Sequence, residues 1–266
     1  MTPEVKRKVV FMKDYSFDYP QLFLDIYVEG DEYEQRNFAP FFALAGCKKA
    51  LTPEKADLVV FTGGPDVNPI LYDEAAHSTT DFDAKRDESD IKLYEYCIMA
   101  GVPMLGVCRG AQFLWVMSGG KLYQDVDNHQ TGHDIWDLDN KKWVPASSVH
   151  HQMVIYDPSL GMEVIATSSR ANTRWRNDIQ CDLTAKPDVE AYYLPDSCIL
   201  GIQGHPEYAG YEKFAKWSLE KLYECVVSNP DVTIINGVHR LKESVRDERS
   251  ARWEEMVDTR MVGGMN

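Results

Sequence analysis

Short apolar runs that alternate with stretches of helical periodicity make up the first half of the chain. Continuous apolar runs are typical of strands that a parallel sheet buries on both faces. The sequence predicts three such strands, at residues 8–12, 57–62 and 102–107. Segments with helical spacing of their apolar residues follow the strands. This alternation predicts an α/β fold, in which helices cover both faces of a central, mainly parallel sheet.

The helices predicted among these strands have recognisable ends. They cover residues 35–45, 87–100 and 109–117. Gly46 and Gly101 directly follow the first two helices, and a glycine at this position readily adopts the left-handed conformation that ends a helix. Acidic residues in the first turn of the second helix suit the positive end of the helix dipole.

In the second half of the chain, strand-like segments follow one another with short connections. Short connections favour antiparallel neighbours, because parallel strands need long crossovers. The segments are residues 149–156, 162–167, 189–194 and 198–203, and a last long helix is predicted at about residues 210–227. We therefore expect the C-terminal half of the sheet to be more antiparallel.

The last segment, residues 229–266, differs in composition from the rest of the chain. Residues 240–260 include six basic and six acidic residues, with Trp253 and Met256 as isolated apolar positions. This pattern predicts a charged helix that is either solvated on the surface or in contact with a partner. We therefore expect a domain at residues 1–228 followed by a charged, helical extension at 229–266.

Composition and charge restrict the class of protein. The chain of 266 residues has a net charge of −14, which argues against broad binding to nucleic acid. Its six cysteines include no C-x-x-C pair, and no run approaches the roughly 18 apolar residues of a membrane span. The apolar run after the N-terminal basic cluster is too short for a signal peptide. We therefore expect a cytoplasmic protein with reduced cysteines and no membrane contact.

Cys108 lies where the third predicted strand meets the helix that follows it. The N-terminus of a helix offers unpaired N–H groups and a partial positive charge, which favour a thiolate nucleophile. Gly106 and Gly110 leave room for a sharp turn around the cysteine. The N–H of Arg109 would stabilise the oxyanion that forms when a carbonyl is attacked. Cys108 is either such a nucleophile or a buried structural thiol.

The base that such a nucleophile needs is predicted much further along the chain. His205 and Glu207 are separated by Pro206, which favours extended backbone. In an extended segment both side chains point the same way, so Glu207 can orient the His205 ring. The segment follows a predicted strand, as Cys108 does, and open α/β sheets place their sites at the carboxyl ends of strands. The sequence therefore predicts a Cys-His-Glu triad.

Several separated motifs resemble those of the class I glutamine amidotransferase superfamily and follow the same order. They are FTGGPDVNPILY at residues 61–72, GVCRGAQ at 106–112 and GIQGHPE at 201–207, with RDESD, SGGKLYQD and VHHQMV between them. The chain is most similar to the peptidase C26 branch, which includes γ-glutamyl-GABA hydrolase. The resemblance covers roughly residues 9–228 and implies the flavodoxin-like fold of that superfamily.

The resemblance also implies roles for individual residues. One group would catalyse the reaction, a second would form the oxyanion hole, and a third would bind the substrate. The matches are Cys108 as nucleophile, His205 as general base and acid, Glu207 as its orienting carboxylate, Gly63, Gly64 and Arg109 as the oxyanion hole, and Gln112, His151 and Gln152 as substrate contacts. The resemblance implies no metal ion and no organic cofactor.

Two features depart from that family pattern. The family usually has an aromatic residue before the histidine of its H-P-E motif, where this chain has Gly204, so we expect a different substrate preference. Residues 169–187 replace what is a tighter turn in many relatives. Arg174, Trp175 and Arg176 in this segment would bind an anionic substrate or a partner, unless the segment is an ordinary surface loop.

Other polar clusters have simpler interpretations. His129 and His133 have the spacing of zinc ligands on a helix, but a glycine lies between them and no acidic ligand is fixed by spacing, so no metal site is expected. The side chains of His150 and His151 would face opposite ways on a strand, which makes one of them structural. The acidic run at residues 81–90 is expected to be a solvated loop and helix start.

Three functions are compatible with the sequence. The first is a self-contained hydrolase that cleaves glutamine or a γ-glutamyl amine through a γ-glutamyl thioester. The second is a glutaminase subunit that delivers ammonia to a separate synthase. The third is a catalytically silent relative that acts by binding. The expected partners are a small γ-glutamyl substrate and, through the C-terminal extension, a synthase or a second copy of the chain.

Overall fold

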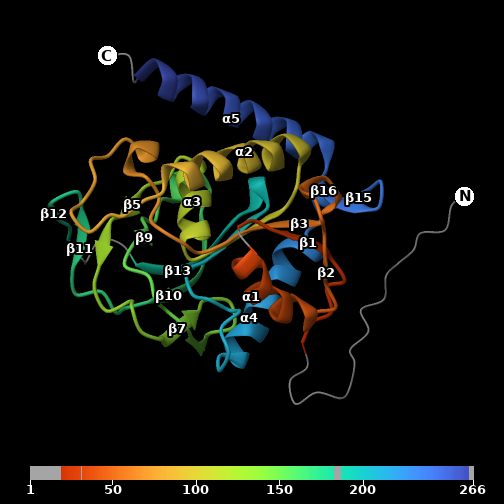
Figure 1. Cartoon of the computed structure of the whole chain (residues 1–266), viewed down its shortest axis with the longest axis horizontal. Coiled ribbons are helices and arrows are strands. Elements are labelled where there is room, and N and C mark those ends of the chain that lie inside the picture. Colours follow the sequence, from red (N-terminus) through yellow and green to blue (C-terminus); the bar gives the residue numbers. More distant parts are fainter. Residues whose placement is uncertain (1–18, 31, 183–186, 264–266) are drawn as a thin grey trace, which may run out of the picture.

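The computed structural model describes residues 19–263, apart from residue 31 and residues 183–186 (Figure 1). The strand predicted at residues 8–12 lies outside these ranges. A nine-stranded sheet runs through the molecule. In spatial order its strands are β2 (Lys48–Lys49), β1 (Asp25–Val28), β3 (Leu58–Phe61), β4 (Met104–Val107), β14 (Ile199–Ile202), β13 (Asp188–Leu194), β10 (Glu163–Ser168), β7 (His133–Asp137) and β8 (Lys142–Ala146).

The sheet changes from parallel to antiparallel pairing between β14 and β13. Every pair from β2 to β14 is parallel, and every pair from β14 to β8 is antiparallel. The predicted α/β fold with a more antiparallel C-terminal half is thereby confirmed. Short strands form three smaller ladders, which are β5 (Leu122–Tyr123) with β9 (Met153–Val154), β6 (Asp125–Val126) with β11 (Arg174–Arg176) and β12 (Ile179–Gln180), and β15 (Val232–Ile235) with β16 (Val238–Leu241).

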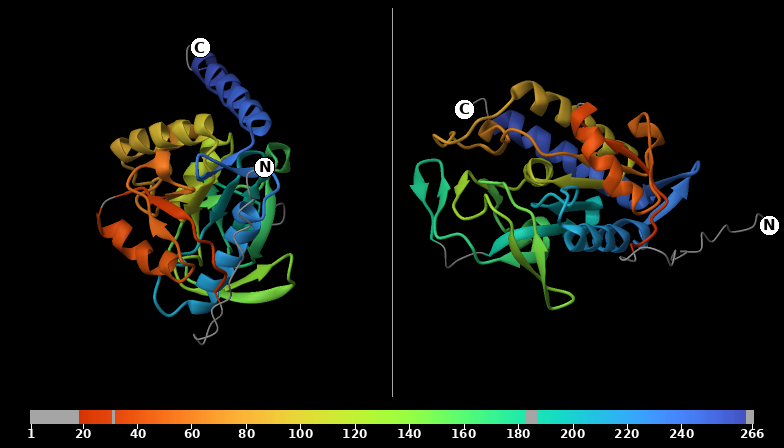
Figure 2. Two further views of the ribbon diagram at one scale, coloured as in Figure 1. Left: turned by 90° about the vertical axis from the view of Figure 1, so that its right-hand side faces the viewer. Right: turned by 60° about the horizontal axis from the view of Figure 1, so that its bottom comes forward.

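Helices cover both faces of the sheet. Figures 1 and 2 show α2 and α3 on one side, α1 and α4 on the other, and α5 across the outside of α2. A single turn of π-helix, Tyr223–Val227, continues α4. The helices are α1 (Glu32–Ala43), α2 (Ala84–Ala100), α3 (Arg109–Met117), α4 (Glu212–Leu222) and α5 (Glu243–Gly263).

Strand β3 explains why the molecule has a core on each face of the sheet. Successive side chains of a strand point to opposite faces. Leu58 and Val60 join the core under α1 and α4, whereas Val59 and Phe61 join the core under α2 and α3. All four side chains are fully buried. This two-sided burial accounts for the continuous apolar run by which the sequence predicted the strand.

Helix α5 packs along α2. The rings of Trp253 and Tyr94 meet edge to face, with their centroids 5.1 Å apart. Trp253 is therefore a packing contact and not an isolated apolar position. Neither α5 nor any other helix in the described ranges has the length and apolar character needed to cross a membrane. The division into a domain at residues 1–228 and an extension at 229–266 stays a prediction.

The predicted elements near the centre of the sheet agree best with the structure. Helix α3 has the predicted bounds, and α2 begins a turn earlier than predicted because the Asp83 side chain caps it, accepting hydrogen bonds from the N–H groups of Lys85 and Arg86. The strand predicted at residues 149–156 was wrong in length, since only Met153–Val154 pairs. The sequence analysis also missed β1, which lies beside β3.

Candidate functional site

Cys108 occupies a sharp turn between β4 and α3. Its φ is +54° and its ψ is −112°, a backbone conformation that residues other than glycine rarely adopt. The Cys108 N–H donates a hydrogen bond of 2.8 Å to the carbonyl of Ile202 in the neighbouring strand β14. Strained backbone of this kind persists only where surrounding contacts fix it, and it is concentrated at functional sites. The side chain is 9% exposed.

Two glycines allow this turn because no side chain would fit at either position. A Cβ on Gly110 would lie 2.0 Å from the carbonyl oxygen of Phe61 in β3. A Cβ on Gly106 would lie 2.6 Å from backbone atoms of Gly110 and Ala111. The clashing atoms belong to the backbone, so they cannot move aside as a flexible side chain would. The glycines therefore let α3 begin directly against β3 and β4.

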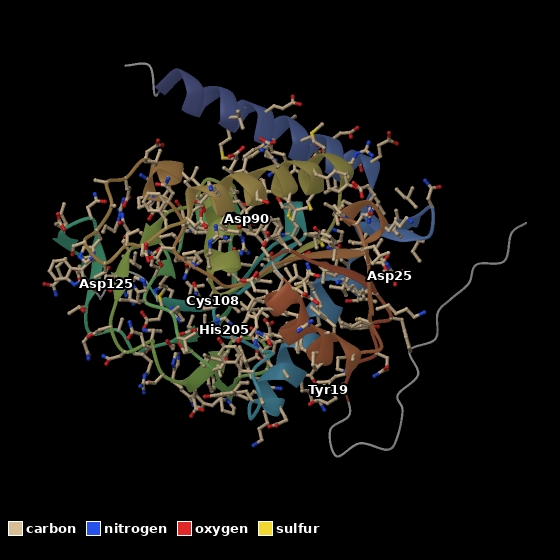
Figure 3. The ribbon with its side chains drawn as sticks, viewed as in Figure 1. Tyr19, Asp25, Asp90, Cys108, Asp125 and His205 are labelled. Carbon is tan, nitrogen blue, oxygen red and sulfur yellow. The ribbon has the colours of Figure 1, made fainter. Side chains whose placement is uncertain are left out.

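His205 and Glu207 lie beside this turn because β14 runs parallel to β4. The register places Ile202 opposite Val107, so the residues that follow both strands leave the sheet at the same edge. His205 Nδ1 lies 2.7 Å from Glu207 Oε1, and the ring also hydrogen-bonds Cys108. Figure 3 shows Cys108 and His205 close together at the centre of the molecule. The fold thus brings together the three predicted triad residues.

The contacts of His205 determine its charge. Burial of the ring opposes protonation, but hydrogen bonds to Cys108 and Glu207 outweigh burial and raise the pKa of His205 to about 10. The ring therefore carries a proton at neutral pH. It can supply this proton to a leaving group.

Two further residues position His205, one through its backbone and one through its ring, and the sequence analysis found neither. The Ser147 hydroxyl accepts a hydrogen bond from the His205 N–H and donates one to the His205 carbonyl, at 2.8 and 2.7 Å. The Tyr208 ring stacks on the His205 ring, with centroids 4.4 Å apart and planes inclined by 13°. Tyr208 directly follows Glu207 in the sequence, so an aromatic residue next to the motif was the available signal. Ser147 had no such signal.

The loop after β3 faces the Cys108 turn. A Cβ on Gly63 would lie 3.0 Å from Cε1 of His205 and 3.9 Å from the Cβ of Cys108. Gly64 has a φ of +138°, which favours glycine. Arg109 begins α3, so its N–H has no acceptor within the helix. The role of these backbone groups as an oxyanion hole stays a prediction.

The Arg109 side chain points away from the sulfur into a buried ionic network. Its guanidinium binds Asp87 at 2.7 Å and also binds Asp90. Arg86 binds Asp90 at 3.1 Å and donates a hydrogen bond of 3.0 Å to the Thr62 hydroxyl, next to Gly63. Asp87 and Asp90 are 3% and 0% exposed, so the prediction that residues 81–90 are solvated was wrong for these two. The network anchors α2 behind the Gly63 loop.

The three predicted substrate contacts have protein partners. Gln112 donates its side-chain amide to the carbonyl of Gln152 at 2.9 Å. His151 lies 3.1 Å from a carboxylate oxygen of Asp66 and 3.4 Å from one of Asp125. The hydrogen bond to Asp66 raises the pKa of His151 above its ordinary value. Gln112 and Gln152 are buried and His151 is half-buried. Their contact with a substrate stays a prediction.

The segment at residues 169–187 uses its arginines within the chain. Arg174 is buried and pairs with Asp188, and Arg176 donates a hydrogen bond of 3.1 Å to Glu74. These carboxylates neutralise both guanidinium groups. To bind an anionic substrate or a partner, these side chains would need a positive charge that no carboxylate of the chain already pairs. The structure therefore does not favour that prediction.

Gly204 is surrounded by groups that leave no room for a side chain. A Cβ at this position would lie 2.5 Å from the carbonyl oxygen of Ser147 and 2.8 Å from the Phe214 ring. Phe214 comes from α4 and is fully buried. The Phe214 ring therefore occupies the space beside His205 that a side chain at position 204 would need.

His129 and His133 do not share a helix, which agrees with the rejection of a helical zinc motif. His129 lies in the connection after β6, and His133 begins β7. Both rings contact the Glu190 carboxylate of β13 in the interior of the antiparallel half of the sheet. None of the three is among the groups that surround Cys108.

Known proteins resemble the chain in sequence. The family model described as peptidase C26 matches residues 48–207. The glutamine amidotransferase-like protein YvdE of Lactococcus lactis is 34% identical over 164 residues, which are 57% of this chain and 66% of that protein. The glutamine-hydrolysing GMP synthase of Listeria innocua is 28% identical over 167 residues, which are 60% of this chain and 25% of the synthase. The match therefore spans less than two thirds of either relative.

The fold also has a counterpart among crystal structures. A protein from Thermoplasma acidophilum, described as one of the subunits of a GMP synthase, superposes with a TM-score of 0.52. The superposition covers 78% of this chain and 96% of the other, at 18% sequence identity. At such low identity the similarity is evidence for a shared fold and for nothing finer.

Proposed function

Because the chain belongs to the peptidase C26 family of the class I glutamine amidotransferase superfamily, we propose that it hydrolyses a γ-glutamyl amide bond with Cys108 as nucleophile. The observation that carries this proposal is the position of the His205 ring. It hydrogen-bonds Glu207 through Nδ1 and contacts Cys108 at the strained turn. A histidine oriented by a carboxylate and aimed at a nucleophile is the arrangement that acyl transfer requires.

In the proposed reaction, the proton of the Cys108–His205 pair resides on the histidine. The sulfur attacks the γ-carbonyl carbon, and the carbonyl electrons move to the oxygen, which the N–H groups of Gly64 and Arg109 stabilise. When the tetrahedral intermediate collapses, the C–N bond breaks and His205 gives its proton to the departing ammonia or amine. The product on the enzyme is a γ-glutamyl thioester.

The second half of the proposed reaction regenerates the enzyme. His205 is now neutral and takes a proton from water, which attacks the thioester carbonyl. The C–S bond breaks, glutamate leaves, and the proton taken from water stays on His205 beside the Cys108 sulfur. The Glu207 carboxylate holds the ring in one orientation through both steps.

A panel of amides tests this proposal. Purified wild-type protein is incubated with glutamine and with γ-glutamyl derivatives of small amines, and glutamate release is measured beside Cys108→Ala. We expect release by the wild type only. If no amide yields glutamate and no acyl group is found on Cys108 by mass spectrometry, the catalytic proposal is wrong and the chain acts by binding.

A second candidate function is a glutaminase subunit that delivers ammonia to a synthase. The match to the Listeria enzyme favours this function. The alignment covers 25% of that synthase, and the rest of the synthase is not aligned with this chain. This alternative predicts weak glutaminase activity that rises when a synthase partner from a cell extract is added. Free hydrolysis of γ-glutamyl amines without any partner would exclude it.

The pKa of His205 predicts the alkaline limit of the activity. Because contacts with Cys108 and Glu207 raise this pKa from 6.5 to about 10, the proton needed by the leaving amine is present below that pH and lost above it. We expect kcat/KM to fall as the pH rises through about 10. Glu207→Gln removes one of the contacts that raise the pKa, so its limit should move to lower pH.

The measurement is a pH profile of kcat/KM for the wild type and Glu207→Gln in the same buffers. Tyr208→Phe provides a matched control, since it keeps the ring that stacks on His205 and both of the histidine's hydrogen bonds. An unchanged alkaline limit in Glu207→Gln would contradict the proposed role of Glu207.

A further inference from the structure

Four buried side chains from separate segments converge in the antiparallel half of the sheet. They come from the connection after β6, from the first residue of β7, from the segment before β9 and from the middle of β13. Figure 1 shows β7 and β13 in this part of the molecule. We call them the His3Glu cluster, which consists of His129, His133, His150 and Glu190, at 0%, 8%, 3% and 2% exposure.

The hydrogen bonds of the three rings determine where their lone pairs point. Each Nδ1 lies close to a backbone carbonyl oxygen, at 2.8 Å for His129, 3.0 Å for His133 and 3.0 Å for His150. A carbonyl oxygen only accepts hydrogen bonds, so Nδ1 must carry the proton in each ring. In the neutral rings every Nε2 then offers a lone pair. Histidines that ligate metal ions through Nε2 have this second bond to a carbonyl.

All three Nε2 atoms face the Glu190 carboxylate. His133 Nε2 lies 2.8 Å and His129 Nε2 lies 3.2 Å from Oε1, and His150 Nε2 lies 3.7 Å from Oε2. Among the described residues, His150 Nε2 has no hydrogen-bond partner, although the atom is buried. The carboxylate also has partners within the chain: His133 Nε2 is at hydrogen-bond distance from it, and the Ser168 hydroxyl donates to Oε1 at 2.8 Å and lies 3.2 Å from His129 Nε2. With neutral rings, the remaining lone pairs face a carboxylate in a site of low dielectric, which is unfavourable. A cation in their midst turns the same arrangement into a favourable one.

We propose that His129, His133 and Glu190 of this cluster bind one divalent transition-metal ion, with Zn²⁺ as the best match. Their ligand atoms lie within 4.8 Å of one another, whereas His150 lies outside this group. A tetrahedral Zn²⁺ with bonds of about 2.0–2.1 Å spaces its ligand atoms about 3.3–3.4 Å apart. The Nε2 atoms of His133 and His129 lie 2.8 and 3.2 Å from Glu190 Oε1, close to that spacing. Oxygen-preferring Mg²⁺ and Ca²⁺ are disfavoured by two imidazole nitrogens. Three protein ligands leave the fourth position of the ion to a small ligand such as water.

The ion would connect parts of the chain that secondary structure leaves separate. It would tie β7 and β13 to the connection after β6, whose His129 ring lies 5.0 Å from the ring of His150 in the segment before β9. That segment also contains Ser148, whose hydroxyl donates to the carbonyl of His129, and Ser147, which holds the His205 backbone. The metal would therefore stabilise the wall against which His205 is positioned, without touching the substrate. Metal sites of this kind contribute directly to folding stability.

Elemental analysis and calorimetry of the full chain test the proposal. We expect protein purified without chelators to contain about one Zn²⁺ per chain, as a single buried site implies. After removal of metal with a chelator and dialysis, Tm should fall, and added Zn²⁺ should restore it and bind with one-to-one stoichiometry. Mg²⁺ should leave Tm unchanged. Metal-stripped wild type that binds no Zn²⁺ and whose Tm does not respond to it would overturn the proposal.

Variants distinguish this site from other zinc-binding groups. Glu190→Gln and His133→Gln each remove one ligand and should bind Zn²⁺ at least tenfold more weakly than the wild type. His77→Gln is the matched control, because His77 lies outside the cluster and bonds to the Thr79 hydroxyl. Equal Zn²⁺ affinity in wild type and ligand variants would place the ion elsewhere and refute the assignment. The stoichiometry and Tm of the wild type decide the question even if a variant does not fold.

Discussion

Cys108→Ala is expected to lower the rate of glutamate release by at least about 10⁴-fold, since removal of a triad nucleophile eliminates the covalent route. The size of this loss follows from the geometry. The sulfur is the group at the strained turn that contacts His205, and a methyl group leaves the histidine with nothing to activate. Cys108→Ser should retain a small residual rate, because a hydroxyl in the same place is a poorer nucleophile.

The rate is measured with the best amide of the panel, together with trapping of the acyl-enzyme by acid quench and mass spectrometry. Cys97→Ala is the matched control, because Cys97 is a fully buried thiol of α2 in the core. It should keep the activity and lose only some stability from the small cavity. Wild-type rates in Cys108→Ala would remove this residue from the reaction, and comparable losses in both variants would indicate general unfolding.

Among substitutions that add a single methyl group to the chain, we expect Gly110→Ala to lower the stability most. The new Cβ would lie 2.0 Å from the carbonyl oxygen of Phe61, in a strand that is buried on both faces. To accommodate it, α3 would have to move away from β3. We expect a loss of at least about 3 kcal/mol in the free energy of unfolding, more than ordinary overpacking costs.

Urea unfolding followed by tryptophan fluorescence measures this loss, and the soluble fraction replaces it if the variant does not fold. Gly161→Ala is the control, because a Cβ there has no atom within 4 Å and only the φ of +76° opposes it. Its cost should be about 1–2 kcal/mol, the penalty for a left-handed residue. A similar cost for both variants would show that α3 does not approach β3 as closely as described.

The centre of the sheet and the candidate triad could be predicted because their signals are local. The apolar run of β4, the following glycines and the bounds of α3 all depend on neighbours in the sequence. The H-P-E motif likewise places His205 and Glu207 close together, although Pro206 and Glu207 form a turn and not the extended segment that the sequence predicted. The sequence did not show that β14 lies beside β4. We expected the two segments to meet because open α/β sheets place their sites at the carboxyl ends of their strands.

The antiparallel half could not be predicted to the same depth, because its contacts join distant segments. His129 gives no sign that it shares Glu190 with His133 and His150, since the four residues come from four segments of the chain. Its strands are short, and polar residues such as Arg174 are buried there with carboxylates. Hydrophobic periodicity misses polar interiors of this kind, because their stability comes from pairing and not from apolar area.

The parallel register of β4 and β14 also has a consequence for the time course of folding. The proposed nucleophile and its histidine become neighbours only when β14 lies beside β4, which is a non-local pairing. In the unfolded chain the Cys108 thiol is open to solvent, whereas in the folded structure the residue is 9% exposed. Protection of Cys108 from an alkylating reagent during refolding would therefore report closure of the sheet around it.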